Sequence, residues 1–292
     1  MRWLVTGAGG LLGRDLCAAL AEVGEGDVVA ATRADLDITD PAAVRAAVAR
    51  TDVVFNAAAW TDVDGAEEAE DAATAVNGHA VRMLAEAVGP RLVHFSTDYV
   101  FDGTATAPYP EDASPAPVNA YGRGKALGER AVLARGGYVV RTAWLYGEHG
   151  PNFVRTMLTL AAERDTVDVV DDQQGPPTWS AALARQAVAL AAAASAGRAA
   201  PGVYHGTSAG STTWYGLARA VFAEARLDPG RVRPTSSNRF RRPARRPAYS
   251  VLGRDRWSGT AIAPLPRWRP MLAEAMPRLL GGGGPAGQRS VF

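Results

Sequence analysis

Short apolar runs alternate with amphipathic stretches along the first half of the chain. The runs are four or five residues long, as expected of buried strands, and cover residues 2–6, 28–32, 53–56, 92–96 and 139–142. Alanine-rich patterns with helical spacing separate them, around residues 41–50, 67–88 and 121–135. This alternation predicts an α/β fold with a doubly wound parallel sheet, a Rossmann sheet.

A glycine-rich turn joins the first predicted strand to an amphipathic helix, whose apolar face carries Leu16, Leu20 and Val23. The turn contains Gly7, Gly10 and Gly13, and glycines at such a place let backbone N–H groups and the positive end of a helix approach a phosphate. No Gly-Lys-Ser/Thr follows, so phosphoryl transfer is disfavoured. A chance cluster among the 31 glycines is the alternative, which the position directly after a strand makes weaker.

The end of the second predicted strand indicates the type of dinucleotide. An acidic residue there binds the ribose 2′-hydroxyl of NADH, whereas an arginine accommodates the 2′-phosphate of NADPH. This strand ends in Thr32 and Arg33 with no carboxylate at its tip, which favours NADPH and leaves NADH as the alternative. Asp37 and Ile38, a few residues further on, are expected to border the adenine.

Prolines interrupt the second half of the chain and leave shorter helical patterns, at about 152–163, 180–196 and 212–226. We therefore expect residues 1–150 to form the NAD(P)-binding Rossmann core, with elements that return to it from about 151–210. Residues from about 151–280 are expected to form mainly a smaller substrate-binding lid. The glycine-rich tail, 281–292, lacks apolar periodicity and is predicted to be disordered.

Composition excludes several classes of function. With 31 basic and 30 acidic side chains the net charge is +1, so neither nucleic acid nor a membrane surface is an expected partner. No apolar run reaches the roughly 18 residues of a membrane span, and the chain is expected in the cytoplasm. Cys17 alone cannot form an internal disulfide and is expected in the core. The four histidines lack ligand spacing, so no metal site is predicted.

Lys125 is the only lysine among 31 basic residues. Arginine replaces lysine on a solvated surface, but not where a compact ammonium group must lie beside a reacting group. Tyr121 precedes Lys125 by four residues, which on a helix places both side chains on one face, about one turn apart. The two residues are therefore candidates for joint catalysis, and an exposed helical pair without function is the alternative.

The pair suggests a general acid. A cation about 4 Å from a phenol, at an effective dielectric constant of about 20, contributes roughly 4 kcal/mol. That is about three pKa units, so at the limit the pKa of Tyr121 would fall from near 10 to near 7. Such a tyrosine can donate a proton to a carbonyl oxygen while hydride adds to the carbonyl carbon, as a ketone reductase requires.

A hydroxyl group is expected to hold the carbonyl oxygen beside this pair. Ser96 and Thr97 lie at the end of the predicted strand 92–96, where a parallel sheet presents its carboxyl ends to a ligand. Either hydroxyl suits this role. The alternative is a local one, since Ser, Thr and Asp often form turns and caps at strand ends.

Taken together, the glycine turn, the hydroxyl residues Ser96 and Thr97, and the pair of Tyr121 and Lys125 resemble the extended short-chain dehydrogenases/reductases. Among these, the chain most resembles the dTDP-4-dehydrorhamnose reductase family that acts on dTDP-4-keto-6-deoxysugars. The matches extend over about residues 1–270. They include Thr6-Gly7-x-x-Gly10-x-x-Gly13, Leu36-Asp37-Ile38-Thr39, Asn56-Ala57-Ala58-Ala59-Trp60-Thr61, Ser96-Thr97-Asp98-Tyr99-Val100-Phe101-Asp102-Gly103, Tyr121 with Lys125, and Arg141-Thr142-Ala143-Trp144-Leu145-Tyr146-Gly147. The string from Ser96 to Gly103 is far more specific than any glycine turn.

The resemblance implies Thr97, Tyr121 and Lys125 as catalytic residues, with Tyr121 as the acid and Lys125 also holding the nicotinamide ribose. With the residues derived above, the expected cofactor contacts are Gly7, Gly10, Leu11, Leu12, Gly13, Thr32, Arg33, Asp37, Ile38, Ala58, Ala59, Trp60, Tyr121 and Lys125. The expected substrate contacts are Thr97, Asp98, Tyr99, Trp144 and Asn152. An indole such as Trp144 can pack on a sugar ring and exclude water, although a place in the core of the lid is the alternative.

Two positions depart from the family's pattern. Leu11 replaces a polar residue often found in that turn, and Thr32 stands where some relatives carry an acidic residue. The second departure puts a preference for NADH in doubt.

A basic run from residue 239 to residue 247 contains five arginines in a chain of nearly zero net charge, and its prolines keep it from forming a helix. Three interpretations are open. A lid loop that faces a diphosphate fits a protein that handles nucleotides. A nucleic-acid patch has no support from the global charge, and a solvated surface is the third interpretation.

The leading hypothesis is NADPH-dependent reduction of the C4 ketone of a dTDP-4-keto-6-deoxyhexose in the biosynthesis of a rhamnose-like deoxysugar. A non-catalytic, NADP-binding regulatory subunit on the same scaffold is the alternative from another class, which the presence of Thr97, Tyr121 and Lys125 disfavours. An NDP-sugar epimerase or dehydratase is the alternative among enzymes. A dehydratase needs an acid/base carboxylate pair beside the threonine, and here only Asp98 follows it. The expected partner is a nucleotide sugar, and the oligomeric state is left open, a homodimer included.

Overall fold

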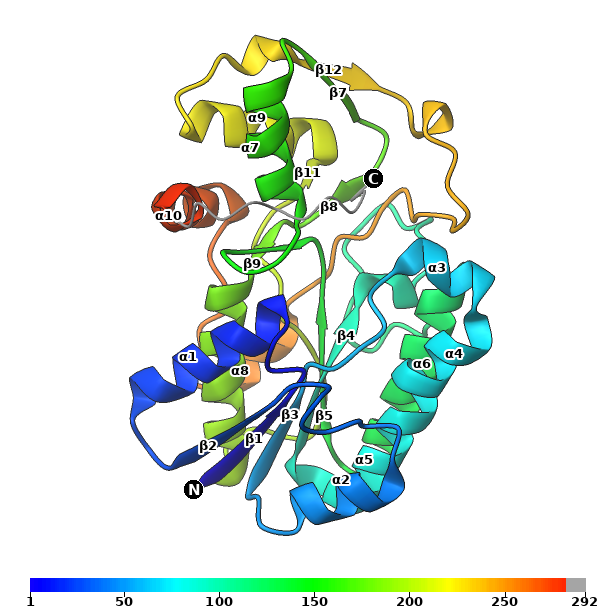
Figure 1. Ribbon diagram of the computed structural model, residues 1–292, viewed down its shortest axis with the longest axis vertical. Coiled ribbons are helices and arrows are strands. Elements are labelled where there is room, and N and C mark those ends of the chain that lie inside the picture. The colour runs from blue at the N-terminus through cyan, green and yellow to red at the C-terminus, as the bar shows by residue number, and fades with distance from the viewer. Residues whose placement is uncertain (282–292) are drawn as a thin grey trace.

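The structure, a computed structural model, describes residues 1–281. At its centre lies a six-stranded parallel sheet with the strand order β10-β5-β4-β3-β1-β2 (Figure 1). The chain moves outward from β1 in both directions, to β2 on one side and to β3 on the other. This reversal defines a doubly wound sheet, so the predicted fold class is confirmed.

Five strands of the sheet lie within a residue of the predicted ranges. They are β1 (Arg2–Thr6), β2 (Asp27–Ala31), β3 (Val53–Asn56), β4 (Leu92–Thr97) and β5 (Tyr138–Thr142). A sixth strand, β10 (Gly202–His205), comes from the second half of the chain and pairs with β5 at the edge of the sheet.

Helices cover both faces of the sheet (Figure 1). One face packs against α1 (Leu11–Val23) and α8 (Ser180–Ser195), and the other against α2 (Pro41–Val48), α5 (Val81–Val88) and α6 (Ala120–Leu133). Side chains alternate between the faces along β1, because Trp3 and Val5 belong to the first core and Leu4 to the second. Covering of both faces is what an all-parallel sheet requires.

The long helix predicted at 67–88 is divided in the structure. It consists of α3 (Val63–Glu68), α4 (Glu70–Thr74), the π-helix η1 (Ala75–Ala80) and α5. Ala69 interrupts the helix with φ −134° and ψ 52°. The segment also begins earlier than predicted, because Asp62 caps α3 by accepting a hydrogen bond from the Gly65 N–H at 2.9 Å.

A smaller C-terminal part lies beyond the carboxyl ends of the sheet (Figure 1). Its helices are α7 (Phe153–Glu163), α9 (Trp214–Glu224) and α10 (Trp268–Gly281). Three short strand pairs accompany them: parallel β6 (Leu145–Tyr146) with β9 (Thr178–Trp179), parallel β7 (Val167–Val170) with β12 (Val232–Thr235), and antiparallel β8 (Gln174–Gly175) with β11 (Thr212–Thr213). Single 3-10 turns lie at Gly89–Arg91, Asp98–Val100, Pro229–Arg231, Ser237–Arg239 and Asp255–Gly259.

The helix α10 and the exposure of Val23 differ from the sequence pattern, whereas Cys17 agrees with it. The pattern does not predict α10, because Pro270 and Pro277 are both helix breakers by type. Pro270 lies in the first turn, where its missing N–H costs no hydrogen bond, whereas Pro277 lies inside the helix. Val23, predicted on the buried face of α1, is 51% exposed, since α1 ends there at a left-handed Gly24. Cys17 is half-buried and packs against the core as expected.

Two elements from the second half of the chain return to the Rossmann core. The elements α8 and β10 lie within 151–210, the range in which returning elements are expected. The tail 281–292 lies outside the described residues except for Gly281, which ends α10. Between residues 1 and 281, no helix combines the length and the apolar character needed to cross a membrane.

A buried ion pair holds α6 against the sheet. Arg141 of β5 and Glu129 of α6 have side chains only 2% and 1% exposed. Two hydrogen bonds join them, from Nε to Oε1 at 3.0 Å and from Nη2 to Oε2 at 2.8 Å. The guanidinium group also lies 4.9 Å from the centroid of the Phe101 ring. Because α6 carries Tyr121 and Lys125, this pair contributes to the position of both.

We predict that Glu129→Gln lowers the free energy of unfolding by about 3–5 kcal/mol, because it leaves the Arg141 charge buried without its counter-charge. Denaturant titration would measure the change. Glu86→Gln is the matched control, since the Glu86–Arg135 pair is 3.9 Å apart and half exposed; it should cost less than about 1 kcal/mol. Equal effects of the two substitutions would contradict the prediction.

Candidate active site

A cavity of about 840 Å³ lies at the carboxyl ends of the strands, where the strand order reverses between β1 and β3. Most of the predicted site residues line it, although they come from distant parts of the chain. They are Gly7, Gly10, Leu11, Leu12, Gly13, Thr32, Arg33, Asp37, Ile38, Ala58, Ala59, Trp60, Thr97, Asp98, Tyr121, Lys125 and Trp144. The fold therefore brings the glycine turn, the tyrosine and the lysine into one cavity.

Backbone contacts at the glycine turn leave no space for side chains. Gly7 has φ +67°, and a Cβ atom there would lie 2.6 Å from the backbone nitrogen of Ala58. A Cβ at Gly13 would lie 2.2 Å from the carbonyl oxygen of Gly7. The first turn of α1 is thereby drawn against β1 and the end of β3.

The N-terminus of α1 is open toward the cavity. Its N-cap is Gly10, which has no side chain to satisfy the free N–H groups, and its first turn carries no acidic residue. Free N–H groups and the helix dipole together favour an anion such as a phosphate.

The end of β2 presents an exposed arginine whose acidic neighbours in sequence are held by threonines. Arg33 is exposed and lines the cavity. The nearest acidic side chain in sequence, Asp35, is held by Thr32, whose N–H and hydroxyl donate to its Oδ2 at 3.0 and 2.6 Å. Asp37 is held by Thr39 in a similar way, and these hydrogen bonds lower its pKa. Arg33 is thus left available to a ligand.

Tyr121 and Lys125 lie one turn apart on α6, as the spacing predicts. Asn119 caps this helix by accepting a hydrogen bond from the Gly122 N–H at 2.8 Å. Gly122 itself is needed for close packing, since a Cβ there would lie 2.1 Å from the carbonyl oxygen of Tyr99. The start of α6 is therefore fixed on both sides of Tyr121.

The Lys125 ammonium group is buried and directed at the sheet. The side chain is 3% exposed, and Nζ donates to the carbonyl oxygen of Phe95 at 2.6 Å. Nζ also lies 3.4 Å from Nε2 of His94. Burial lowers the pKa of Lys125 to about 8, and the charge of Glu129 opposes this shift.

A chain of buried polar groups continues from Lys125 across three strands. Nδ1 of His94, on β4, lies 2.9 Å from Nδ2 of Asn56, on β3. Oδ1 of Asn56 accepts a hydrogen bond from the hydroxyl of Thr6, on β1, at 2.6 Å. Burial, followed by the charge of Lys125, holds the pKa of His94 well below its usual value. The imidazole is therefore neutral, and its tautomer depends on the orientation of the Asn56 amide.

The predicted shift in the pKa of Tyr121 is wrong in sign. Burial, and then the negative charge of Asp98, raise the pKa of Tyr121 to about 12, although a hydrogen bond with Thr97 opposes the change. The ammonium group of Lys125 is engaged by Phe95 and does not offset desolvation. Tyr121 thus keeps its proton at neutral pH, which is the form that an acid requires.

Thr97, rather than Ser96, is connected to the tyrosine. Its hydroxyl donates to Oδ1 of Asp98 at 3.0 Å and accepts from the Tyr99 N–H at 3.1 Å, and its interaction with Tyr121 lowers the pKa of that phenol. Asp98 is 3% exposed, and burial raises its pKa to about 6 despite the hydroxyls of Ser250 and Thr97. Ser250, which the sequence does not indicate, comes from the C-terminal part.

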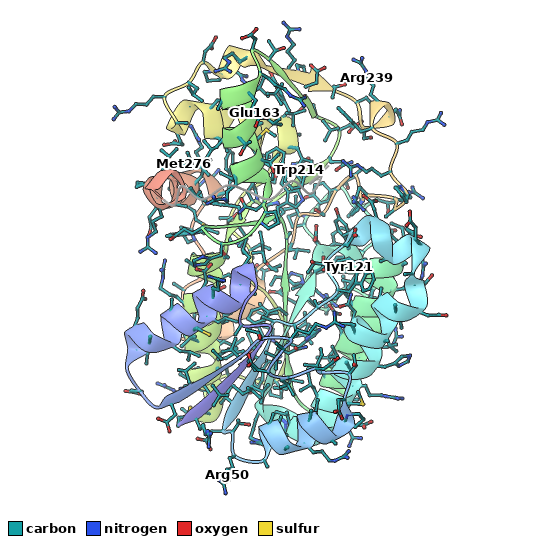
Figure 2. All side chains as sticks on the ribbon, viewed as in Figure 1. Arg50, Tyr121, Glu163, Trp214, Arg239 and Met276 are labelled. Carbon is teal, nitrogen blue, oxygen red and sulfur yellow. The ribbon has the colours of Figure 1, made fainter. Side chains whose placement is uncertain are left out.

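Trp144 lines the cavity from the loop that follows β5. Its backbone has φ +49°, a conformation that costs a bulky residue on the order of 1–3 kcal/mol. Its ring is stacked on that of Trp214, from the start of α9. Figure 2 labels Trp214 in the C-terminal part and Tyr121 on the sheet side.

Two expected substrate contacts, Tyr99 and Asn152, do not line the cavity. The Tyr99 ring lies edge-on to that of Tyr121, with centroids 6.0 Å apart. Asn152 is 4% exposed and caps α7, where its Oδ1 accepts from Arg155 N–H at 3.2 Å. Both side chains make contacts within the protein. Direct contact of Tyr99 or Asn152 with the substrate stays a prediction.

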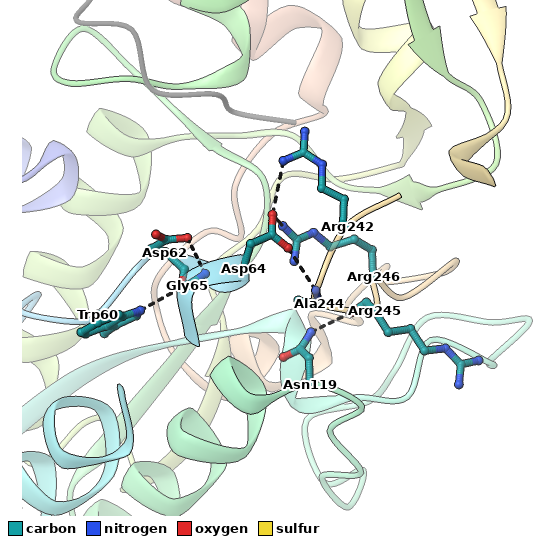
Figure 3. A network of polar contacts seen from close by, with 9 residues as sticks. All are labelled: Trp60, Asp62, Asp64, Gly65, Asn119, Arg242, Ala244, Arg245 and Arg246. Carbon is teal, nitrogen blue, oxygen red and sulfur yellow. Dashed lines mark hydrogen bonds and ion pairs between the residues drawn. The ribbon is translucent and has the colours of Figure 1, made fainter. Parts of the chain in front are cut away.

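Two of the five arginines of the basic run are held by ion pairs, and the other three are exposed. Arg242 and Arg246 lie 3.2 and 3.0 Å from Oδ2 of Asp64, at the start of α3 (Figure 3). The Ala244 N–H donates to Oδ1 of Asp64 at 3.1 Å. Asn119, the cap of α6, donates to the carbonyl oxygen of Arg245 at 2.9 Å. The run therefore connects the C-terminal part to α3 and α6, and none of its arginines lines the cavity.

Comparisons with known proteins agree with this arrangement. A family model described as "RmlD substrate binding domain" matches residues 1–280. A dTDP-4-keto-6-deoxy-D-glucose reductase of Streptomyces niveus is 53% identical over 95% of this chain and 97% of its own. A probable dTDP-4,6-dihydroxy-2-methyloxan-3-one 4-ketoreductase of Streptomyces antibioticus is 52% identical over the full length of both chains.

Solved structures give the same picture. A dTDP-4-dehydrorhamnose reductase from Bacillus anthracis in complex with NADP has a TM-score of 0.88 and 36% identity, covering 94% of this chain and 98% of its own. A UDP-glucose 4-epimerase from Thermus thermophilus, 20% identical, has a TM-score of 0.80 over 96% of this chain and 99% of its own, and shares the fold alone.

We predict that Asp98 makes stability depend on pH. Its folded-state pKa of about 6 lies above the ordinary value of 3.8, so its stabilising contribution is complete below the lower value. That contribution is lost as the pH rises through about 6, by at most about 3 kcal/mol. In denaturant titrations between about pH 4 and about pH 7, the free energy of unfolding of the wild type should decline by this amount relative to that of Asp98→Asn, because the buried His94 and His205 act equally in both proteins.

The control for this experiment is Asp165→Asn, which changes an exposed carboxylate and should keep the wild-type pH profile. Parallel profiles for Asp98→Asn and the wild type would show that Asp98 does not carry the effect.

Proposed function

Because the chain belongs to the RmlD substrate binding domain family, we propose that it uses NADPH to reduce the C4 ketone of a dTDP-4-keto-6-deoxyhexose to an alcohol. The observation that supports this most directly is the cavity, in which the protonated Tyr121 and the hydroxyl of Thr97 lie together with the glycine turn. The reaction belongs to the biosynthesis of deoxysugars.

The residues of the cavity fit NADPH. The backbone at Gly7 and Gly13 excludes side chains, so a pyrophosphate can approach the open N-terminus of α1. Arg33 and Thr32 would meet the 2′-phosphate, and Asp37 with Ile38 would border the adenine. Ala58, Ala59 and Trp60 would line the opposite wall. When bound there, NADPH supplies the hydride that adds to C4 of the sugar.

Tyr121 would donate the proton that completes the alcohol. Its pKa of about 12 keeps the phenol protonated, and the carbonyl oxygen becomes more basic as negative charge develops on it. Thr97 and Tyr121 both line the cavity and interact, so a carbonyl oxygen bound between them would meet both hydroxyl groups. Lys125 would hold the nicotinamide ribose, with its position set by Phe95 and His94.

The sugar nucleotide would occupy the part of the cavity bounded by Asp98 and Trp144, beneath the C-terminal part. We assign residues 1–150 to the cofactor-binding core, with α8 and β10 returning to it, and the rest of 151–280 mainly to substrate binding. The C-terminal part supports this assignment, because its Ser250 hydroxyl acts on the carboxyl group of Asp98.

The alternatives fit less well. A dehydratase needs a pair of carboxylates beside the threonine, and here Tyr99 follows Asp98. A non-catalytic NADP-binding subunit would have no use for a half-buried tyrosine beside a buried threonine and a buried lysine in the cavity. The cytoplasmic location rests on the sequence alone and is part of the proposal, whereas the oligomeric state is left open, a homodimer included.

Tyr121→Phe should keep the fold and the affinity for NADPH but reduce kcat by roughly two to four orders of magnitude, because it removes only the proton donor. NADPH oxidation would be followed with dTDP-4-keto-6-deoxyglucose and with its 3,5-epimerised form. Tyr138→Phe is the control, since the Tyr138 hydroxyl bonds to Ala199 outside the cavity. Silence of the wild type with every NDP-ketosugar would favour the non-catalytic alternative.

Arg33→Ala should raise the KM for NADPH by about tenfold or more and leave the KM for NADH nearly unchanged, because only NADPH carries a 2′-phosphate. Arg50→Ala is the matched control, since Arg50 is also exposed but lies at the far end of the molecule (Figure 2). If both KM values move together, Arg33 does not select the cofactor.

A further inference from the structure

The indole ring of Trp144 is held from two directions. Its face is stacked on the ring of Trp214, with centroids 3.5 Å apart and planes inclined by 5°. Its edge lies against Gly175, where an added Cβ would come within 2.4 Å of Cε2 and 2.5 Å of Nε1. We call Trp214 and Gly175 the indole clamp.

One antiparallel pair of strands supplies both parts of the clamp. Gly175 of β8 is opposite Thr212 of β11, and Trp214 follows β11 as the first residue of α9. The Trp214 indole N–H donates to Oε1 of Gln173 at 3.2 Å, just before β8. The ring of Phe153, on α7, lies 4.6 Å from that of Trp214. The clamp is therefore built into the C-terminal part, whereas Trp144 follows the sheet strand β5.

The backbone of Trp144 needs such support. Its φ of +49° is an outlier for a bulky side chain, and residues in this region persist only where their surroundings determine the conformation. The Trp144 carbonyl oxygen accepts from the Thr178 N–H at 3.2 Å, which fixes the backbone but not the ring. Among the described contacts, those of Trp214 and Gly175 act on the ring itself.

We propose that Trp214 and Gly175 are positioning residues that make the Trp144 indole a fixed wall for the hexose of the nucleotide sugar. Neither lines the cavity, so their effect on the ligand passes through Trp144. Trp214 covers one face of the indole and leaves the opposite face to the apolar C–H face of a sugar ring. This inference rests on the proposed function for the identity of the ligand.

The test is a double-mutant cycle between Trp144→Ala and Trp214→Ala. The probe is dTDP-glucose, whose Kd is measured by calorimetry with NADP⁺ present, so that the readout does not depend on turnover. Trp268→Ala is the matched control, because Trp268 begins α10 as Trp214 begins α9 and does not line the cavity. Trp214→Phe tests rescue by another aromatic ring.

We expect Trp214→Ala to raise the Kd for dTDP-glucose about tenfold, the upper range of an aromatic pair, and to leave the Kd for NADPH within about twofold. In the Trp144→Ala background the same substitution should add less than about twofold. Trp214→Phe should restore most of the affinity, and Trp268→Ala should not alter it. With a ketosugar substrate, KM should rise more than kcat falls.

Gly175→Ala approaches the ring from the other direction and should raise the Kd similarly, because its methyl group would displace the indole. Gly259→Ala is its control, since a Cβ at Gly259 meets no atom within 4 Å. This variant keeps the test decisive if Trp214→Ala fails to fold.

Two kinds of failure are distinguishable. If the wild type binds dTDP-glucose but reduces no ketosugar nucleotide, the proposed reduction is contradicted. The double-mutant cycle still tests the indole clamp in that case. If Trp214→Ala leaves the Kd unchanged, or weakens binding equally with and without Trp144, the clamp is overturned and the reduction is unaffected. A wild type that binds no dTDP-hexose would overturn both.

Discussion

The site depends on direct backbone contact at the glycine turn that follows β1. Gly13 approaches the Gly7 carbonyl, and Gly7 approaches Ala58, at distances that no side chain could share. This contact sets the first turn of α1 against the sheet at the point of strand reversal. The anion-binding end of the helix and the carboxyl ends of β1 and β3 consequently open into the same cavity.

A second requirement follows from the burial of charge. The Lys125 ammonium group, 3% exposed, is tolerated because the Phe95 carbonyl oxygen and His94 meet it, and because Glu129 lies on the same helix. The hydrogen bonds that continue through Asn56 to the β1 strand tie this group to three parallel strands. The polar interior thus holds the lysine relative to the sheet, while the buried Arg141–Glu129 pair holds the helix that carries it.

Polar and aromatic contacts join the C-terminal part to the core. Asp64 receives two arginines of the basic run, Ser250 acts on Asp98, and Trp214 covers Trp144 (Figures 2 and 3). Two of these contacts end on residues of the cavity, Asp98 and Trp144, and the third ends on Asp64 of α3. Residues that do not line the cavity, such as Trp214, therefore hold residues that do. The basic run joins the C-terminal part to α3 and α6.

The sequence by itself determined five of the six strands of the sheet, the glycine turn and the placement of Tyr121 beside Lys125. Each depends on neighbours in the chain: alternating apolar runs, glycines directly after a strand, and a spacing of one helical turn. Only the tertiary structure decided the rest. The pKa of Tyr121 rises because burial outweighs the nearby cation, and burial is not a local property. Asp64, Ser250 and Trp214 contact partners that are 70 or more residues away in the chain, so no local pattern could indicate them.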